Sequence, residues 1–207
     1  MIAVQTVTEL ESIVGTPSPR AAAKVRAALA GVDREWLAAS SLLFMATTDD
    51  RGNLDVSPKG DQAGFVRVLD DTTLAIPDRP GNRRADGFHN LLANPHIGLV
   101  FLIPGRGDTL RINGRATVVR DAEFFDEMIV RGHRPDLAVV VEIDEVFFHC
   151  SKAFLRSKAW DPAEWQPGSA PRRAVIAHAV ERHDESLAQL DEYYGSASYA
   201  DGLYGPA

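Results

Sequence analysis

The sequence predicts a mainly β fold, an antiparallel barrel with peripheral helices. Six or seven short apolar or alternating runs follow one another along the chain, and few helical segments separate them. The clearest run alternates apolar and polar residues from Leu110 to Val118, as a half-buried strand does. With 207 residues, of which 45% are hydrophobic, the chain is large enough for one domain with a sizeable core.

The chain ahead of the barrel is expected to be helical. A short helix with an acidic first turn is predicted from Thr8, strong helix formers occupy residues 21–29 after a Pro-Ser-Pro break, and a further short helix begins at Asp33. We therefore expect a helical extension over residues 1–40. The barrel domain is expected over residues 41–165, and a linker with a C-terminal helix over residues 166–207.

Turn residues bound the predicted strands. Asp49–Asn53 and Pro58–Asp61 are rich in the residues that form turns. Residues 97–103 are apolar almost throughout, as a fully buried strand would be. The expected strands cover residues 42–48, 54–57, 64–69, 73–76, 97–103, 110–118 and 137–148. Their number and spacing favour a closed antiparallel barrel.

Four helical segments are predicted between and after these strands. Asn94-Pro95 ends a helix over residues 85–93, and Asp121 caps a second helix that continues to about Val130. A basic helical segment covers residues 152–160, and a C-terminal helix covers residues 174–193.

Composition excludes several classes of function. A net charge of −7 argues against nucleic acid as a partner, because nucleic-acid-binding proteins usually carry a basic face. The single cysteine excludes an internal disulfide and a multi-cysteine metal site, and the spacing of the histidines is unsuited to a metal. No apolar run approaches the roughly 20 residues of a membrane helix, and no signal peptide is recognisable, so we expect a cytoplasmic protein without a membrane partner.

The most informative segment is a basic turn, Arg79-Pro-Gly-Asn-Arg-Arg84, between a predicted strand and a predicted helix. Arginine offers a rigid fork of donors that matches phosphate oxygens, and a helix N-terminus adds oriented N–H groups. The segment therefore suggests a phosphate site. The alternative is a solvated, arginine-rich turn.

Two further basic clusters are present, at Ser57–Asp61 and at Cys150–Trp160. If the latter is helical, Lys152 and Arg156 share one face and repel each other. An anion, as ligand or from a partner subunit, would relieve that repulsion. The alternative is a solvated basic face.

Seven motifs in a fixed order resemble one group of flavoproteins. They are LDVSPKGD (54–61), GFV (64–66), IPDRPGNRR (76–84), NLLANP (90–95), GLVFLIPG (98–105), TLRINGRA (109–116) and CSKAFLRSKAW (150–160). The group is the pyridoxamine 5'-phosphate oxidase-like proteins, in their uncharacterised FMN-dependent branch. The resemblance covers about residues 8–165.

The resemblance implies a six-stranded split β-barrel that forms a homodimer, with two FMN molecules at the subunit interface. It places the flavin phosphate against two strand residues and three residues of the basic turn. It also places Arg111 near the site and lets the third basic cluster reach the partner subunit's flavin. The implied cofactor-binding residues are Ser57, Lys59, Arg79, Asn82, Arg83, Arg111, Lys152, Arg156 and Lys158. Arg120 and Arg131 lie outside the motifs, and no role in cofactor binding is expected for them.

The resemblance further implies an FMN-dependent oxidoreductase that acts on a small molecule, with NADH or NADPH as a possible electron donor. A C-terminal arginine motif that helps true pyridoxamine phosphate oxidases bind their substrate is absent, which argues against that substrate. Two alternatives remain open. One is a flavin carrier or sensor without turnover. The other is an enzyme on the same barrel that uses a different flavin-like ligand or haem, for which His149 would be the axial ligand.

Overall fold

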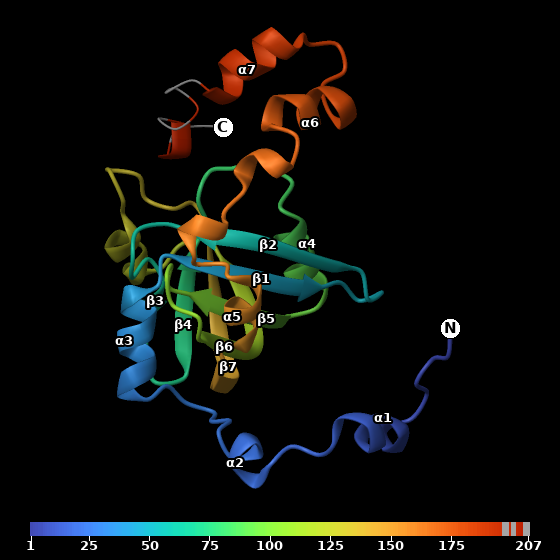
Figure 1. The fold of residues 1–207 in the computed structure, drawn as a ribbon. Helices are drawn as coiled ribbons and strands as arrows, with labels where there is room; N and C mark the ends of the chain where they lie inside the picture. Colours follow the sequence, from blue (N-terminus) through green and yellow to red (C-terminus); the bar gives the residue numbers. More distant parts are fainter. Residues whose placement is uncertain (196–198, 200–201, 205–207) are drawn as a thin grey trace.

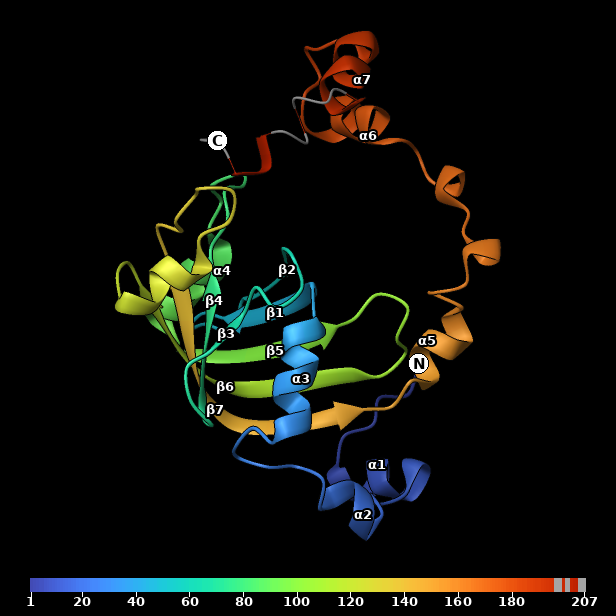
Figure 2. The same cartoon turned by 90° about the vertical axis from the view of Figure 1, so that its left-hand side faces the viewer.

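Seven antiparallel strands form one sheet in the order β2-β1-β5-β6-β7-β4-β3 (Figures 1 and 2). The computed structural model describes residues 1–195, 199 and 202–204; the other residues of the predicted C-terminal region lie outside that description. The strands are β1 Leu42–Thr48, β2 Leu54–Gly60, β3 Arg67–Val68, β4 Thr73–Pro77, β5 His96–Leu102, β6 Thr109–Val119 and β7 Ala138–His149.

The expected antiparallel fold with peripheral helices is confirmed, and the sheet is consistent with a split barrel. It has seven strands rather than six, because the short β3 pairs with β4. It is not closed, because β2 and β3 are its two edges and are not paired with each other. The expectation of a closed barrel was therefore wrong.

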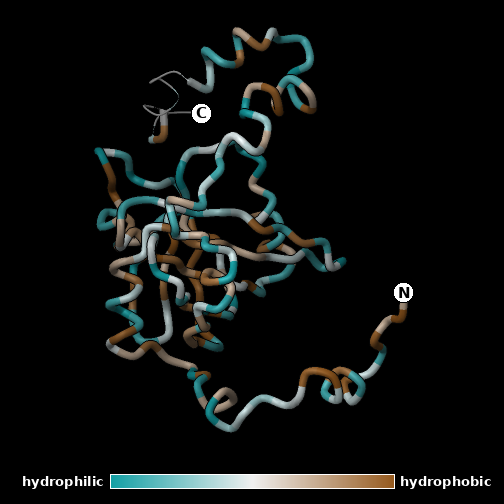
Figure 3. Tube along the Cα trace, in the orientation of Figure 1, coloured by the Kyte–Doolittle hydropathy of each residue, from teal (hydrophilic) through white to brown (hydrophobic). Residues whose placement is uncertain are grey.

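Alternation along the strands separates an inner face from an outer face. On β1, Leu43 and Met45 are buried, whereas Phe44 between them is partly exposed. The inner residues of β1, β4, β5, β6 and β7 form the main core together with Trp36 and Leu37. Figure 3 shows the hydrophobic residues gathered in this central part of the chain.

Some helices lie against the sheet, and those near the two ends of the chain extend away from it (Figures 1 and 2). In the described part of the chain, none is long and apolar enough to cross a membrane. The α-helices are α1 Val7–Val14, α2 Pro19–Ala22, α3 Gly31–Ala39, α4 Asp86–Ala93, α5 Lys152–Ser157, α6 Arg173–Val180 and α7 Leu187–Gly195. The 3-10 helices are η1 Glu123–Met128, η2 Pro162–Glu164, η3 Pro167–Ser169 and η4 Gly202–Tyr204.

Two strand predictions differ from the structure. The predicted turn at Pro58–Asp61 is largely strand, because β2 continues to Gly60. Proline fits there because β2 is an edge strand, where a missing N–H costs least. The predicted strand over 64–69 shrinks to β3, because Gly64 has a φ of 80° and the Phe65 N–H donates to the Gln62 carbonyl in a turn.

Local helix propensity was overridden twice before β7. Residues 21–29 were expected to be helical, but α2 ends at Ala22 and the backbone of Arg26 pairs with Val146 instead. The predicted helix after Asp121 is the short η1, with Ala122 at its N-cap position and no side-chain cap. Asp121 accepts a hydrogen bond from Arg134 rather than capping the helix.

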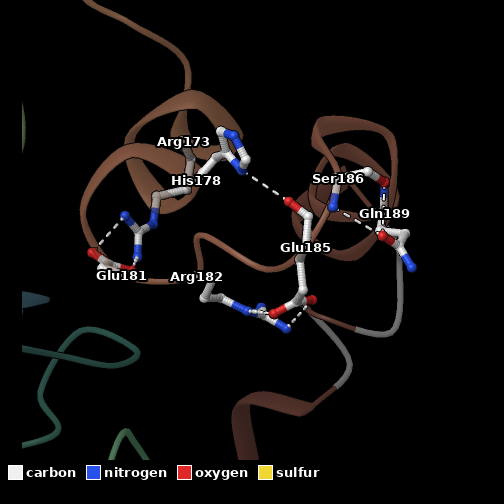
Figure 4. A network of polar contacts seen from close by, with 7 residues as sticks. All are labelled: Arg173, His178, Glu181, Arg182, Glu185, Ser186 and Gln189. Atoms are coloured by element: carbon white, nitrogen blue, oxygen red, sulfur yellow. Dashed lines mark hydrogen bonds and ion pairs between the residues drawn. The ribbon is translucent and has the colours of Figure 1, made fainter.

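The predicted C-terminal helix over 174–193 is two helices, α6 and α7, that fold back on each other. Ala174, Ala177 and Leu190 form a small core of their own with Tyr194 packed against it, and a single straight helix could not bury them together. Figure 4 shows the connection between the helices, where Arg182 pairs with Glu185 and His178 hydrogen-bonds to the Glu185 carbonyl. Arg173 and Glu181 add an ion pair at the end of α6 (Figure 4).

Candidate active site

The basic turn borders a cavity of about 590 Å³. Residues of β2 and the start of α4 line one side, and the loop after η1 lines the other. The turn itself contributes Arg79, Asn82 and Arg83. The remaining lining residues are Lys59, Asp78, Pro80, Gly81, Ala85, Phe88, Gly132, His133, Arg134, Pro135, Asp136 and Tyr204.

A second cavity of about 310 Å³ adjoins the first and shares Lys59, Asn82, Ala85 and Phe88 with it. Its floor follows β2. The strand register pairs Asp55, Ser57 and Lys59 with Thr47, Met45 and Leu43, all buried on the inner face. Because side chains alternate along a strand, these three polar groups form one row at the edge of the sheet.

Helix α4 approaches the row closely because Gly87 has no side chain. A Cβ atom at this position would lie 2.9 Å from Met45 Cε and 3.2 Å from Asp55 Oδ2. Asn90 fixes the helix further, since its Nδ2 donates to Thr47 Oγ1 at 3.2 Å. The sheet edge and α4 together hold the turn in place.

Two cations of the turn, and Lys59 of β2 beside it, have carboxylate partners. Lys59 Nζ lies 3.3 Å from Asp78 Oδ1 and 4.9 Å from the centre of the Phe88 ring. Arg79 Nε donates to Asp61 Oδ2 at 2.5 Å, and Arg84 pairs with Asp86 at 2.7 Å, which raises the pKa of Arg84. Arg79 is thus tied to a fully buried carboxylate, so it holds the turn together as well as lining the cavity.

The backbone is strained at the end of the turn. Arg83 in the turn and Ala85 directly after it have φ values of 60° and 54°, in the left-handed region that residues with side chains disfavour. Such strain costs of the order of 1–3 kcal/mol per residue and is concentrated at functional sites. Ala85 is also the N-cap of α4 and offers no side-chain cap to the helix. The conformation directs the chain from the cavity wall into α4.

Asp55 is a site residue that the sequence analysis missed. Its Oδ2 is buried, and no hydrogen-bond partner for it exists in the described part of the chain. It lines the second cavity beside Ser57. The alternation of β2 could have revealed it, because Asp55 is two residues before Ser57.

The far wall of the larger cavity was also missed. Tyr204 donates a hydrogen bond to Asp61 Oδ1 at 2.5 Å, and its ring stacks on His133 at 6.2 Å. The Arg131 guanidinium lies 5.4 Å from the centre of the same ring. Arg131 is therefore close to the cavity, although no role in cofactor binding was expected for it. No sequence signal predicts these contacts, because the residues are far apart along the chain.

Hydrogen bonds shift two pKa values in this wall. Burial alone would raise the pKa of Asp61, but the hydrogen bonds from Tyr204, the Gln62 N–H and Arg79 outweigh it, and the pKa lies below its ordinary value. The pKa of Tyr204 is raised, chiefly because its hydroxyl donates to Asp61. Asp61 is therefore the ionised acceptor and Tyr204 the neutral donor at neutral pH.

Arg111 does not join this site in the chain. The strand register pairs Arg111 with Val100, Val100 with Phe44, and Phe44 with Pro58, so these four residues lie on the same face of the sheet. This is the outer face, opposite to the face that carries Ser57 and Lys59. The Arg111 guanidinium lies 5.2 Å from the Phe147 ring, and its buried Nε has no partner in the described residues.

The third basic cluster also lies away from both cavities. Lys152 and Arg156 are exposed on the short helix α5, as the helical prediction required. Lys158 was expected among the cofactor-binding residues, and in this structure it pairs with Glu164. The reason is the left-handed C-cap at Lys158, with a φ of 52°, after which the chain turns into η2.

Comparison with known proteins identifies the family. The family model for pyridoxamine 5'-phosphate oxidase matches residues 31–150, more than half of the chain. The chain belongs to this family. The matched residues include all strands from β1 to β7, and they include β2 and the basic turn, which line the cavities. Helix α5 and Tyr204 lie beyond the matched residues. No curated protein matches the chain.

Solved structures with a similar chain fold include three bacterial proteins. HupZ from Group A Streptococcus is 18% identical, covers 58% of this chain and 94% of its own, and has a TM-score of 0.47. An FMN-binding protein from Syntrophomonas wolfei is 14% identical, with coverages of 57% and 89% and a TM-score of 0.42. HutZ, the heme storage protein from Vibrio cholerae, is 16% identical, with coverages of 57% and 91% and a TM-score of 0.39.

Proposed function

We propose that this protein binds FMN in the two adjoining cavities and acts as an FMN-dependent oxidoreductase on a small molecule. The observation that carries the proposal is the convergence of Lys59, Asn82 and Arg83 on one cavity from two elements distant in sequence. When bound, FMN would supply hydride transfer at its N5 atom, and the protein supplies orientation and charge.

The donors suit a phosphate monoester. Arg83 and Lys59 provide positive charge, and Asn82 provides an amide donor on the same cavity wall. Ser57 adds a hydroxyl in the adjoining cavity. A terminal phosphate is favoured over a dinucleotide because the sequence has no glycine-rich pyrophosphate loop before a helix.

The remaining groups fit the rest of such a cofactor. The cavities, of about 590 and 310 Å³, fall within the size range of roughly 300–1,000 Å³ for small-molecule sites. Phe88 and Met45 give the second cavity apolar surface, and the unpartnered Asp55 Oδ2 can accept hydrogen bonds from the hydroxyls of a polyol.

A second subunit is part of the proposal. The outer face of the sheet edge carries exposed apolar side chains, including Leu54 at 78% and Val56 at 62% exposure. We call Phe44, Leu54, Val56 and Pro58 the outer patch; the strand register makes Phe44 and Pro58 direct neighbours on one face. Arg111 lies on the same outer face, two strands away from Phe44, and its buried Nε lacks a hydrogen-bond partner in the described residues, so a second copy that covers this face could supply one.

The same arrangement gives the distant basic residues a use. Arg111, Lys152 and Arg156 lie outside both cavities of their own subunit, so they can contribute to an anionic cofactor only from a partner. A cation beside the flavin would stabilise the negative charge of the reduced form. This is the role we assign to Arg111 or Lys152 in the homodimer.

The absorption spectrum of the purified protein, reconstituted with FMN and treated with NADH or NADPH, tests the proposal. We expect a flavin band that bleaches when an electron donor is added. The released chromophore should have the mass of FMN when FAD, riboflavin and haem are also offered. Retention of haem or FAD in its place would overturn the FMN assignment.

A flavin carrier without turnover is the second candidate. It is favoured by the pairing of Lys59, Arg79 and Arg84 with carboxylates, because paired groups are poor general acids or bases. A flavin band that neither NADH nor NADPH bleaches would support the carrier. Haem binding through His149 gains no support here, since His149 is exposed and lines neither of the two cavities.

A further inference from the structure

Two carboxylates pair with cations at the wall of the larger cavity, and they differ in burial. The side chain of Asp61, the partner of Arg79, is fully buried, and Asp61 is not among the residues that line the cavity. Asp78, the partner of Lys59, is 29% exposed and lines the cavity together with that lysine. A ligand in the cavity therefore comes into contact with the Asp78–Lys59 pair.

The Asp78 side chain contributes little to the fold. The backbone secures this position, because the Asp78 N–H donates to the Leu137 carbonyl at 2.8 Å. Among the residues that the structure describes, the carboxylate has one partner, Lys59, whose Nζ lies 3.3 Å from Oδ1. Both side chains of the pair are partly exposed, and such a pair stabilises a protein weakly. A change at Asp78 should therefore act on the cavity rather than on the fold.

Lys59 can bind an anion while it stays paired with Asp78. Its ammonium group has three hydrogens, and the bond to Asp78 uses one of them. The ammonium also lies 4.9 Å from the centre of the Phe88 ring, and Lys59 and Phe88 line both cavities. An anionic oxygen about 3 Å from Nζ would lie at most about 6 Å from Asp78 Oδ1. Two anionic groups that share one ammonium at this distance repel each other.

We propose that Asp78 sets the affinity of the phosphate subsite: its negative charge opposes the phosphate of FMN at Lys59, so that bound FMN exchanges with free FMN instead of being held permanently. The inference rests on the proposed FMN function. A phosphate monoester carries about 1.5 to 2 negative charges at pH 7, and riboflavin lacks this group. Asp78 therefore lowers the preference of the site for FMN over riboflavin.

The test measures the binding of FMN and of riboflavin to full-length Asp78→Asn protein. Asparagine keeps an oxygen acceptor for Lys59 and removes the negative charge. We expect the dissociation constant for FMN to fall about tenfold, because the repulsion ends while Lys59 keeps a partner. The dissociation constant for riboflavin should not change, because riboflavin has no phosphate that Asp78 would repel. Stopped-flow displacement should show most of the gain as a slower release of FMN.

Three further variants separate the charge of Asp78 from other effects. Asp78→Glu keeps the charge and should bind FMN as wild-type protein does. Asp78→Ser, a second uncharged variant, should tighten FMN binding in the same sense as Asp78→Asn. Asp191→Asn removes one negative charge from the pair with Arg172, which lines neither cavity, so it controls for the change in net charge. Melting temperatures identify any variant that fails to fold.

The outcomes are distinct. If wild-type protein binds FMN and the two uncharged variants bind it no more tightly, the inference is overturned and the proposed function stands. An equal gain for FMN and riboflavin, or the same gain in Asp191→Asn, likewise overturns the inference, because the effect would not concern the phosphate. If wild-type protein binds neither flavin, the proposed function fails, and the inference fails with it.

Discussion

At the scale of single residues, the arginines of the basic turn differ in role. Arg79 is 14% exposed and bonded to the buried Asp61, whereas Arg84 is largely exposed and pairs with Asp86. Arg83 has a strained backbone and lines the cavity. The turn therefore combines a buried arginine with a structural bond, an exposed arginine and an arginine that lines the cavity.

Arg83→Ala should weaken FMN binding and leave riboflavin binding unchanged. A charge-assisted hydrogen bond to phosphate is worth about 1.5–3 kcal/mol, or roughly one to two decades in the dissociation constant. Arg83→Lys should recover part of the loss, because lysine keeps the charge but lacks the fork. Titration of the apoprotein by flavin fluorescence measures this, with Arg120→Ala as the control. Equal FMN affinities of wild type and Arg83→Ala would make the turn a solvated loop.

Arg79→Ala should have a different effect, a loss of stability. It removes the cationic partner of a fully buried carboxylate, which typically costs about 3–5 kcal/mol. Urea unfolding with and without riboflavin measures it. Arg84→Ala, which breaks an exposed pair, should cost much less stability, because solvent screens that pair. Similar losses for the two variants would contradict the assignment of Arg79.

Asp61 should make stability depend on acid pH. Its pKa is lowered in the folded state, so its stabilising contribution is present above its ordinary value of 3.8 and is lost as the pH falls through the folded value. Asp61→Asn should therefore flatten the decline of the urea midpoint below about pH 4. Asp191→Asn, at an exposed pair with Arg172, should flatten it less, because solvent screens that pair. An unchanged pH profile in Asp61→Asn would refute this.

At the scale of elements, the strand pair β6–β7 depends on a glycine. The register shifts between Asn113 and Gly114, which marks an irregularity in the ladder. A Cβ atom on Gly114 would collide with the carbonyl oxygen of Glu142 on β7. The two central strands can approach each other here only because the side chain is absent.

Gly114→Ala should consequently destabilise the sheet by about 1–3 kcal/mol, the usual cost of forcing extra atoms into a packed site. Gly98→Ala is the matched control on the neighbouring strand β5. Its added Cβ would lie 3.5 Å from Asn113 Oδ1, an ordinary contact, so it should be neutral. Thermal unfolding of the two variants checks this. A neutral Gly114→Ala would show that β7 can shift at no cost.

At the scale of the whole molecule, the outer patch determines the proposed assembly. Stable dimers usually bury well over 1,000 Å², so we expect the adjoining outer face around Val100, the register partner of Phe44, to take part as well. In the proposed dimer, Arg111 and α5 would approach the partner's cavities. Assembly and cofactor binding should therefore be coupled.

Val56→Asp should convert the proposed dimer to monomer and weaken FMN binding, because a charge would be buried without a partner. Val180→Asp, at a similarly exposed valine on α6, should change neither property. Light scattering and flavin titration of the same samples provide the measurement. A wild-type monomer of 22.5 kDa with flavin bound would contradict the dimer.

The sequence by itself determined the mainly β fold class, the approximate position of each strand and the family. Strands such as 110–118 could be predicted because alternation is a local property that burial of one face imposes. The family could be recognised because its motifs are also local: Lys59, Asn82 and Arg83 belong to short contiguous segments of the sequence. Their roles toward FMN stay predictions.

Only the tertiary structure decided which of these groups meet. It separated Arg111 from Lys59 by the strand register, bonded Arg79 to Asp61, and placed Tyr204 against a turn more than a hundred residues earlier. It also broke the expected helices at 21–29 and 174–193, where β pairing and a small core outweighed local propensity. Long-range contacts of this kind depend on the closure of long loops and on burial, and no local pattern records them.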